Sequence, residues 1–266
     1  MAKPFRPKRG TTAKNDAFVG LANEVTLDTE RNSLRIHDGV TAGGVAELAP
    51  VFSKNYGKSI GVFGGSISVQ TASQAAKNIW RKALKCSITD YGVGGAGFSS
   101  LQGDSIQNQV QRAGKHDIYI LWCSTNDFTN SREVGLYSDY TYIDGYDESK
   151  LKTQCGGINF CIKYLTDNFP DAEIYLFTST RMFTSESGYN TLSTARNNAG
   201  YSFDDYLNGQ IQCCGLYGIP FLNQFDGMGI SILNNTRYSS DGIHFNEAAY
   251  KKLGYAQAAF LMNGGL

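Results

Sequence analysis

From residue 50 onward, short apolar runs alternate with longer stretches of helical periodicity, and this alternation restricts the fold more than any other feature of the chain. The apolar runs read as five strands, at residues 59–64, 87–91, 117–123, 173–178 and 219–222. The stretches between and after them read as five helices, near residues 70–84, 100–113, 149–168, 192–214 and 246–262. Alternating strands and helices form parallel sheets that helices cover on both faces. We therefore expect an α/β fold with three layers, α/β/α, around a central parallel five-stranded sheet.

Residues 1–49 follow a different pattern. Residues 24–27 and 33–37 alternate polar and apolar side chains, which is typical of strands with one buried face. The polar residues 28–32 join them as a turn. Two or three short strands cannot bury a core on their own. We therefore expect a small β-rich module at 1–49 that associates with copies of itself, followed by a second domain at 50–266.

Composition and charge exclude several classes of function. Acidic and basic residues balance at 24 each, so nothing favours the electrostatic capture of nucleic acid or of an anionic membrane. The basic first nine residues precede no apolar run, so we expect no signal peptide, and no segment has the apolar length for membrane insertion. The six cysteines show no metal-ligand spacing. We expect them to be reduced and buried, and we expect no metal and no cofactor.

A serine follows the first of the predicted strands at a glycine turn. The apolar run leads into Gly64 and Gly65, and Ser66 stands just before a helical stretch. Open α/β sheets bind ligands at the carboxyl edge of their strands, and backbone N–H groups near a helix start stabilise negative charge there. A Gly-Gly-Ser sequence is also an ordinary turn when taken alone. The interpretation therefore depends on residues elsewhere in the chain.

A serine hydroxyl needs a base before it can act as a nucleophile. The chain has three histidines. His37 lies in the N-terminal module, and His116 precedes a strand, which places it at the opposite edge of the sheet. This leaves His244, with Asp241 three residues earlier, where the carboxylate can hold the imidazole Nδ1–H. The same Asp-Gly-Ile-His sequence can also form a turn and a helix cap.

Two further residues follow predicted strands and can stabilise a developing oxyanion. Gly95 belongs to a glycine-rich loop after the strand at 87–91, and its backbone N–H can approach a ligand closely. Asn126 follows the strand at 117–123, and its side-chain N–H can point to the same place. The alternative for Asn126 is a cap of the next turn.

These blocks resemble the SGNH (GDSL-type) hydrolase family over about residues 58–262, in the order Ser66, Gly95, Asn126, Asp241 and His244. The resemblance implies an SGNH/flavodoxin-like fold with Ser66 as nucleophile, His244 as general base and Asp241 as its orienting carboxylate. It also implies an oxyanion hole made by the Ser66 amide, the Gly95 N–H and the Asn126 side chain.

The chain departs from that family at two positions. The family has an aspartate before the nucleophile where this chain has Gly65, and a glycine where this chain has Ser124. Neither change removes a group that transfers a proton. The resemblance therefore still implies an active serine hydrolase that acts on ester bonds.

Residues 8–46 contain RGTT, NE.TLDT, LRIHDG and TAGG, and they resemble the small β module at the start of many bacteriophage tail-fibre and receptor-binding proteins. That resemblance implies a homotrimer and a place on the virion, in the phage tail. A cytoplasmic protein without a signal peptide is the alternative. His37 lies within this module and is expected to be structural.

The loop at 128–148 is polar and rich in tyrosine, which favours a carbohydrate over a lipid as the ester substrate. Tyr137 and Tyr140 are candidate sugar contacts, and Arg181 is a candidate contact for an acidic sugar. An aromatic surface loop and an ordinary surface arginine are the alternatives. Three functions remain open: a phage-borne carbohydrate O-acetylesterase, a general small-ester esterase or thioesterase, and a non-catalytic receptor-binding protein on an SGNH scaffold.

Overall fold

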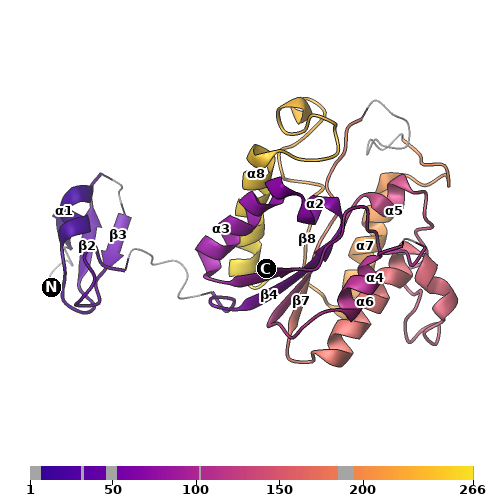
Figure 1. Ribbon diagram of the computed structural model, residues 1–266, viewed down its shortest axis with the longest axis horizontal. Helices are drawn as coiled ribbons and strands as arrows, with labels where there is room; N and C mark the ends of the chain where they lie inside the picture. Colours follow the sequence, from indigo (N-terminus) through magenta and orange to yellow (C-terminus); the bar gives the residue numbers. More distant parts are fainter. Residues whose placement is uncertain (1–6, 31–32, 46–52, 102, 185–194, 266) are drawn as a thin grey trace, which may run out of the picture. The chain divides into compact units, whose positions relative to one another are not determined.

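The computed structural model describes residues 7–30, 33–45, 53–101, 103–184 and 195–265. It divides into two compact units, Met1–Ser53 and Lys54–Leu266 (Figure 1). The expected boundary between residues 49 and 50 lies outside the described residues. So do residues 192–194, the first residues of the helix expected at 192–214.

The smaller unit contains β1 (Lys8–Gly10), α1 (Thr12–Ala17), β2 (Val25–Asp28) and β3 (Ser33–Ile36). Its sheet has the order β1-β2-β3, in which β1 pairs with β2 in parallel and β2 pairs with β3 in antiparallel. The buried Arg35 guanidinium donates to the buried carboxylate of Asp28 at 2.9 Å. His37 is also buried, and its Nδ1 accepts from the Gly20 N–H at 3.1 Å. These buried polar contacts give His37 a structural place in the smaller unit.

The larger unit is built on five parallel strands: β4 (Ser59–Gly64), β5 (Ser87–Asp90), β6 (Ile118–Trp122), β7 (Glu173–Phe177) and β8 (Phe221–Leu222). Their order in the sheet is β5-β4-β6-β7-β8, and each neighbouring pair is parallel. The predicted fold class is therefore confirmed. The first strand of the larger unit, β4, lies inside the sheet, so the chain leaves β4 in one direction to reach β5 and returns across it to reach β6.

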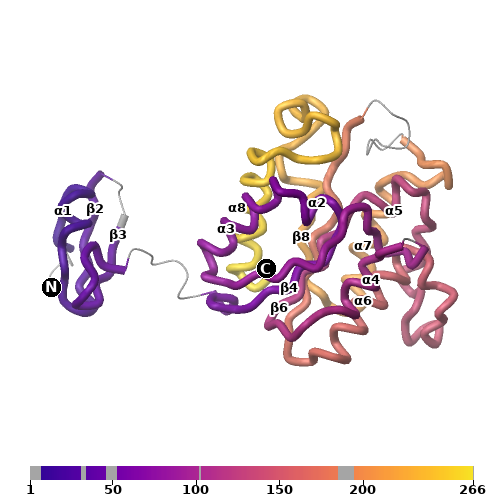
Figure 2. Tube along the Cα trace, in the orientation of Figure 1, coloured from indigo at the N-terminus to yellow at the C-terminus, as the bar shows by residue number. Residues whose placement is uncertain are grey.

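Helices cover both faces of this sheet (Figures 1 and 2). On one face α3 (Gln74–Leu84) packs beside α8 (Glu247–Met262). The other face carries α4 (Ile106–Gln111), α6 (Gln154–Asn168) and α7 (Phe203–Tyr217). The short elements are α2 (Ser66–Val69), η2 (Thr71–Ser73), α5 (Asn126–Thr129), η3 (Glu148–Lys152) and η4 (Asn235–Arg237).

Side chains of β6 show how the strand contributes to both layers of the core. Ile118, Ile120 and Trp122 pack in the cluster that includes α3 and α8, whereas Tyr119 and Leu121 pack against the helices of the other face. All five are at most 1% exposed. A strand buried on both faces reads as a continuous apolar run, which is how β6 appears in the sequence.

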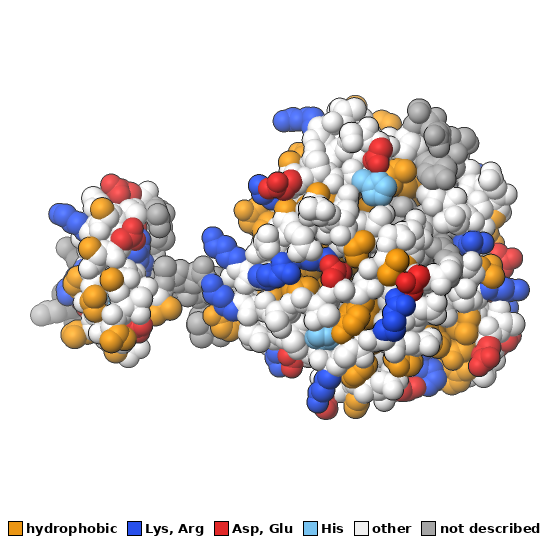
Figure 3. Space-filling view, viewed as in Figure 1, with side chains coloured by type: hydrophobic (Ala, Val, Ile, Leu, Met, Phe, Trp, Pro, Cys, Tyr) orange, Lys and Arg blue, Asp and Glu red, His pale blue; other side chains and the backbone are white. Residues whose placement is uncertain are grey.

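Two of the predicted helices are longer than the observed ones, because residues at their expected N-terminal ends lie outside the α-helix. The helix expected at 100–113 forms only as α4, and the helix expected at 149–168 is interrupted at Thr153, whose side chain caps α6. All six cysteines are buried and free, as expected. None of the helices in the described ranges combines the length and apolar composition that a bilayer crossing needs. Figure 3 shows acidic and basic side chains interspersed over the viewed face of the larger unit.

Candidate active site

Ser66 is the first residue of α2, immediately after the corner at the end of β4. The side-chain amide of the buried Gln109 clamps this corner: it accepts from the Gly64 N–H at 2.9 Å and donates to the Gly64 carbonyl at 3.1 Å. The buried ammonium group of Lys77 donates to the Ser68 carbonyl oxygen of α2 and pairs with Asp90. Ser66 therefore stands on a short helix whose start and end are both held by the core.

The structure brings Ser66 together with His244 and Asp241 from the far end of the chain. Nε2 of His244 lies 3.0 Å from Oγ of Ser66, and Nδ1 of His244 lies 2.7 Å from Oδ2 of Asp241. A carboxylate can only accept a hydrogen bond, so the imidazole proton belongs on Nδ1. This tautomer leaves Nε2 free to accept the Ser66 hydroxyl proton.

The Asp241 carboxylate accepts several further hydrogen bonds. Its Oδ1 accepts from the backbone N–H groups of His244 at 2.7 Å and Ile243 at 2.9 Å, and from the Ser239 hydroxyl at 3.0 Å. Partial burial disfavours the charged form, but the hydrogen bonds from His244, Ile243 and Ser239 outweigh it and hold the pKa of Asp241 well below its usual range. Asp241 is therefore a charged acceptor at any pH near neutrality.

Gly242 makes the sharp turn between the acid and the histidine possible. Its φ angle of +76° lies in the left-handed region, and a Cβ atom here would collide with the carbonyl oxygen of Phe183. The Phe183 N–H donates to the Gly242 carbonyl at 2.8 Å. The backbone at Phe183 thus packs directly against the Gly242 turn and fixes the position of Asp241 and His244.

The two candidate oxyanion donors other than Ser66 lie at the same edge of the sheet. Asn126 opens α5 after β6, and its Nδ2 donates one hydrogen bond to the Ala96 carbonyl at 2.9 Å. The same Nδ2 would lie 2.6 Å from a Cβ atom on Gly65, so the amide borders the Ser66 corner directly. Gly95 has a φ of +82° and immediately precedes Ala96. An amide nitrogen carries two hydrogens, so one donor of Asn126 remains for a ligand.

Asp127 is a site residue that the sequence reasoning missed. Its carboxylate is buried and accepts from the backbone N–H groups of Phe98 at 2.7 Å and Ser99 at 3.0 Å. Burial raises the pKa of Asp127, and the two backbone hydrogen bonds and the charge of Arg132 oppose this effect. Asp127 ties the glycine loop to the start of α5, and its position next to Asn126 was the available signal.

A polar pocket of about 390 Å³ lies beside Asn126. It is lined by Gly94, Gly95, Ala96, Leu101, Gly103, Asp104, Asn126, Asn130 and Arg132. Arg132 is the second residue that sequence reasoning missed. It follows Asn126 by six positions in the same segment after β6. This closeness in sequence points to Arg132 as a site residue only if Asn126 is already assigned to the site.

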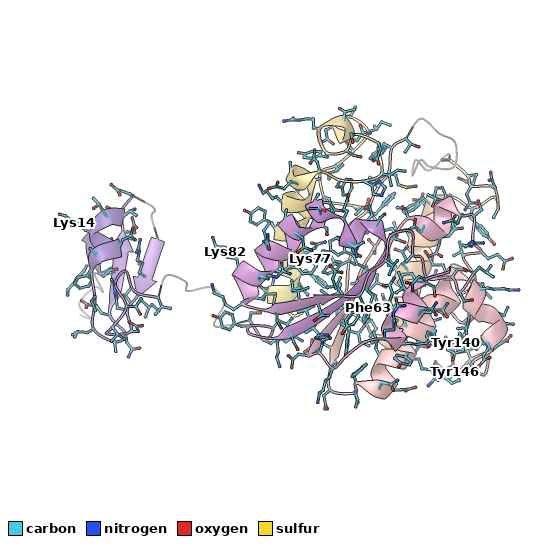
Figure 4. All side chains as sticks on the ribbon, in the orientation of Figure 1. Lys14, Phe63, Lys77, Lys82, Tyr140 and Tyr146 are labelled. Atoms are coloured by element: carbon cyan, nitrogen blue, oxygen red, sulfur yellow. The ribbon has the colours of Figure 1, made fainter. Side chains whose placement is uncertain are left out.

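The structure does not bring the three predicted substrate contacts to this pocket. The Tyr140 ring packs against Tyr146 and against Phe160 of α6, with ring centroids 5.7 and 5.6 Å apart (Figure 4). The Tyr137 carbonyl accepts from the Asn159 side chain of the same helix at 2.9 Å. These contacts hold the tyrosine-rich loop against α6, and a role in sugar binding stays a prediction.

Arg181 is engaged by the protein itself. Its Nη2 donates to Asp226 at 2.8 Å, and its guanidinium lies over the Phe225 ring, 3.8 Å from the centroid. Asp226 therefore offsets the charge that was expected to meet an acidic sugar. Within the described ranges, no three His, Cys, Asp or Glu side chains gather closely enough to hold a metal ion.

Comparison with solved structures defines the class of fold. A protein from Lactobacillus plantarum is 20% identical with a TM-score of 0.66, and the match covers 77% of this chain and 97% of that one. A possible lipase from Chitinophaga pinensis is 17% identical with a TM-score of 0.59, over 79% of this chain and 100% of that one. A candidate GDSL-like lipase from Bacteroides ovatus is 16% identical with a TM-score of 0.55, over 77% and 98%. The larger unit has the fold of GDSL-like lipases, and the resemblance expected from the sequence is confirmed at that level.

The smaller unit has a relative of a different kind. A stretch of 44 residues at the N-terminal end is 54% identical to the tail fiber receptor-binding protein of Bordetella phage BPP-1. The match covers 16% of this chain, and the chain spans only 12% of the length of that phage protein. None of the known protein-family models matches the chain.

Proposed function

We propose that this protein is a serine esterase of the SGNH type that removes O-acetyl groups from a bacterial surface polysaccharide as part of a phage tail fibre or tailspike. The observation that carries the proposal is the hydrogen-bonded series from Ser66 through His244 to Asp241, with separations of 3.0 and 2.7 Å. Distances of this size permit proton transfer without rearrangement of the side chains. The GDSL-like fold of the larger unit supports the same chemistry.

In the first half of the proposed reaction, Ser66 Oγ attacks the carbonyl carbon of the ester. His244 Nε2 takes the hydroxyl proton as the C–O bond forms, and the carbonyl oxygen becomes negatively charged. The Ser66 N–H, the Gly95 N–H and the free amide hydrogen of Asn126 are the donors for this charge. The C–O bond to the sugar then breaks, and His244 returns its proton to the leaving alcohol.

In the second half, water hydrolyses the acetyl group on Ser66. His244 takes a proton from the attacking water, a second tetrahedral oxyanion forms at the same donors, and the proton returns to Ser66 Oγ as acetate leaves. Asp241 remains charged throughout and stabilises the imidazolium. The net reaction converts water and acetylated sugar into the free sugar hydroxyl and acetic acid, which ionises to acetate and a proton, and it balances without a cofactor.

The phage location and the trimer are supported by the smaller unit. Its similarity to a phage receptor-binding protein favours attachment to a virion. The unit also exposes apolar side chains that a partner can cover: Val19, Leu21, Leu34, Val40 and Val45, each at least 44% exposed. Exposed apolar residues at this density favour self-association.

Receptor binding is the second candidate function, because 44 residues at the N-terminal end are 54% identical to a phage receptor-binding protein. A general small-ester esterase or thioesterase is the remaining alternative. Three substrates separate these functions: p-nitrophenyl acetate, p-nitrophenyl esters with longer acyl chains, and acetylated bacterial polysaccharide. The proposal predicts release of acetate from the polysaccharide by the parent protein and none by Ser66→Ala. Hydrolysis of the small esters alone favours the general esterase, and no hydrolysis of any ester favours receptor binding.

A further inference from the structure

The polar pocket beside Asn126 is large enough for the part of a substrate next to the reacting ester. Its volume is about 390 Å³, and Gly95 and Asn126, the candidate oxyanion donors, form one side of it. When these donors hold the carbonyl oxygen of an ester, the neighbouring part of the substrate therefore lies in this pocket. The question is which chemistry the rest of the pocket would recognise.

Arg132 supplies the pocket with a positive charge at a fixed place. Its backbone N–H donates to the Asp127 carbonyl at 2.9 Å, which anchors Arg132 to the residue next to Asn126. The side chain is half-buried, so its guanidinium has less freedom than an arginine on an open surface. The charge thus lies a short distance from the amide that borders Ser66.

The protein leaves much of this guanidinium without acceptors. Its Nε atom has no hydrogen-bond partner among the described residues, but it is buried, so the donors open to a ligand are those of the two Nη atoms. Its Nη2 meets the Leu101 carbonyl oxygen at 3.5 Å, the outer limit of a hydrogen bond. Three arginines show the contrast: Arg35, Arg112 and Arg181 each pair with an aspartate at 2.9 Å or less. A half-buried arginine with open donors favours an anion with two oxygen acceptors.

Two carboxylates lie near the pocket, and each has its own partners. Asp104 lines the pocket but pairs with Arg112 at 2.9 Å. Asp127 is buried behind the glycine loop, where it accepts from the N–H groups of Phe98 and Ser99, and the charge of Arg132 also acts on it. These partners reduce the repulsion that either carboxylate would exert on an anionic ligand.

We propose that Arg132 binds a carboxylate of the substrate beside the acetyl ester, so that the enzyme prefers acidic sugars to neutral ones. The inference rests on the proposed function and names the substrate class of that same site. In a uronic acid, the acidic sugar we have in mind, the carboxylate accepts two hydrogen bonds from the guanidinium while the acetyl carbonyl faces Gly95 and Asn126. Arg132 is a specificity-determining residue in this arrangement, because it contacts the substrate away from the reacting atoms.

The test compares two sugars that differ only at C6, where one has a carboxylate and the other a hydroxymethyl group. Methyl glucuronoside and methyl glucoside, each acetylated on the same hydroxyl, are offered to the parent protein, Arg132→Gln, Arg132→Lys and the control Arg81→Gln. Arg81 lies on α3, and its Nη1 donates to Asn78 of the same helix at 2.9 Å. The measured quantity is the ratio of kcat/KM for the acidic sugar to kcat/KM for the neutral one. We expect the parent ratio to be roughly tenfold to hundredfold above unity, as for hydrogen bonds to charged groups.

Arg132→Gln should bring the ratio close to unity, Arg132→Lys should keep part of it, and Arg81→Gln should leave it as in the parent. Raising the ionic strength should lower the parent ratio, which tests the charge even if Arg132→Gln fails to fold. A parent ratio near unity, or a ratio that survives in folded Arg132→Gln, overturns the inference while the esterase proposal stands.

Failure of the proposed function has a different outcome, namely no acetate from either sugar. Calorimetric binding of unacetylated methyl glucuronoside then decides the anion site separately. Binding that is lost in Arg132→Gln supports the site, and absent or equal binding overturns it.

Discussion

A Cβ atom on Gly65 would lie 2.8 Å from Cβ of Ser124, and these are the two positions at which the chain departs from the SGNH pattern. The Ser124 side chain occupies the space that a side chain at position 65 would need, and its hydroxyl donates to the Ala96 carbonyl at 2.6 Å. A small residue at one position thus accompanies a larger residue at the other. The two departures therefore compensate each other: the side-chain volume absent at position 65 is present at position 124, beside Ser66.

The first prediction concerns Gly65→Ala. The added methyl would also lie 2.6 Å from Asn126 Nδ2 and 2.7 Å from the Ala96 carbonyl, so the corner must shift. Gly65 has a φ of −94°, which any residue adopts, so the effect comes from crowding alone. We expect a loss of about 1–3 kcal/mol in the free energy of unfolding and a lower kcat, measured by urea denaturation and by p-nitrophenyl acetate hydrolysis.

Ser124→Gly should recover part of that loss when it is combined with Gly65→Ala, because one of the three close contacts disappears. The double-mutant cycle measures this coupling directly. Additive effects of the two substitutions would show that positions 65 and 124 do not compensate each other.

The second prediction concerns Asp241→Asn. The amide cannot hold the imidazole in the required tautomer, so kcat should fall by roughly 10⁴-fold, as for other triads. Glu247→Gln is the control, because Glu247 is an exposed carboxylate of α8 whose partner is Lys251. Activity of Asp241→Asn within a few-fold of the parent would remove Asp241 from the mechanism.

Asp241 also predicts a pH dependence of stability. Its pKa is lowered in the folded protein, so the unfolded chain binds the proton more readily. The stabilisation is therefore fully present above the unfolded value of about 4 and is lost as the pH falls below it. The unfolding free energy of the parent should decline more steeply below about pH 4 than that of Asp241→Asn, and parallel declines would contradict this assignment.

The third prediction concerns Asp127→Asn. The Phe98 and Ser99 N–H groups donate to different oxygens of the buried carboxylate. In asparagine one of these oxygens is replaced by an NH₂ group, which donates and cannot accept. The unsatisfied group should lower the unfolding free energy by about 1–3 kcal/mol. It should also lower kcat by up to about a hundredfold, because the glycine loop carries an oxyanion donor. The exposed Asp171→Asn serves as the control, and equal effects of the two substitutions would refute a positioning role for Asp127.

The fourth prediction concerns assembly. All candidate site residues belong to the unit Lys54–Leu266, and the smaller unit exposes apolar side chains. Full-length protein should have the mass of a trimer by light scattering. A chain that starts at Lys54 should be monomeric with the same kcat on p-nitrophenyl acetate. A monomeric mass for each of the two chains would refute the trimer. Loss of activity in the shorter chain would show that the site needs the smaller unit.

The sheet could be predicted because its strands carry their own signal. The apolar run at 59–64 has the observed bounds of β4, and the other strands shift by at most two residues at either end. Strands buried on both faces must be apolar throughout, and glycines follow where the chain turns sharply. The order of the strands in the sheet was not predicted from the sequence, and the structure supplies it as β5-β4-β6-β7-β8.

Elements held by distant hydrogen bonds could not be predicted in this way. The helix expected at 100–113 starts only at Ile106, and before it the Phe98 and Ser99 N–H groups bond to Asp127 while the Ser100 N–H bonds to the Leu151 carbonyl. Neither Asp127 nor Leu151 is visible in the local pattern around residue 100. The helix α1 escapes prediction for a different reason: it has 6 residues, shows no apolar periodicity and begins at a local Thr11 cap.

The candidate site divides in the same way. Ser66 and His244 could be proposed from residue type and position, because each follows a recognisable structural signal. Arg132 and Asp127 depend on how the segment after β6 folds against the glycine loop. Arg181 pairs with Asp226, which the local sequence does not show, and its contact with an acidic sugar stays a prediction.

The most direct test of the whole account is the identity of the acylated residue. The parent protein is mixed with p-nitrophenyl acetate, quenched in acid within the first turnover, digested and sequenced by mass spectrometry. The account predicts an acetyl group on Ser66, a matching burst of p-nitrophenol, and neither of these in Ser66→Ala. Turnover by Ser66→Ala at the parent rate, or an acetyl group on a different residue, would contradict it.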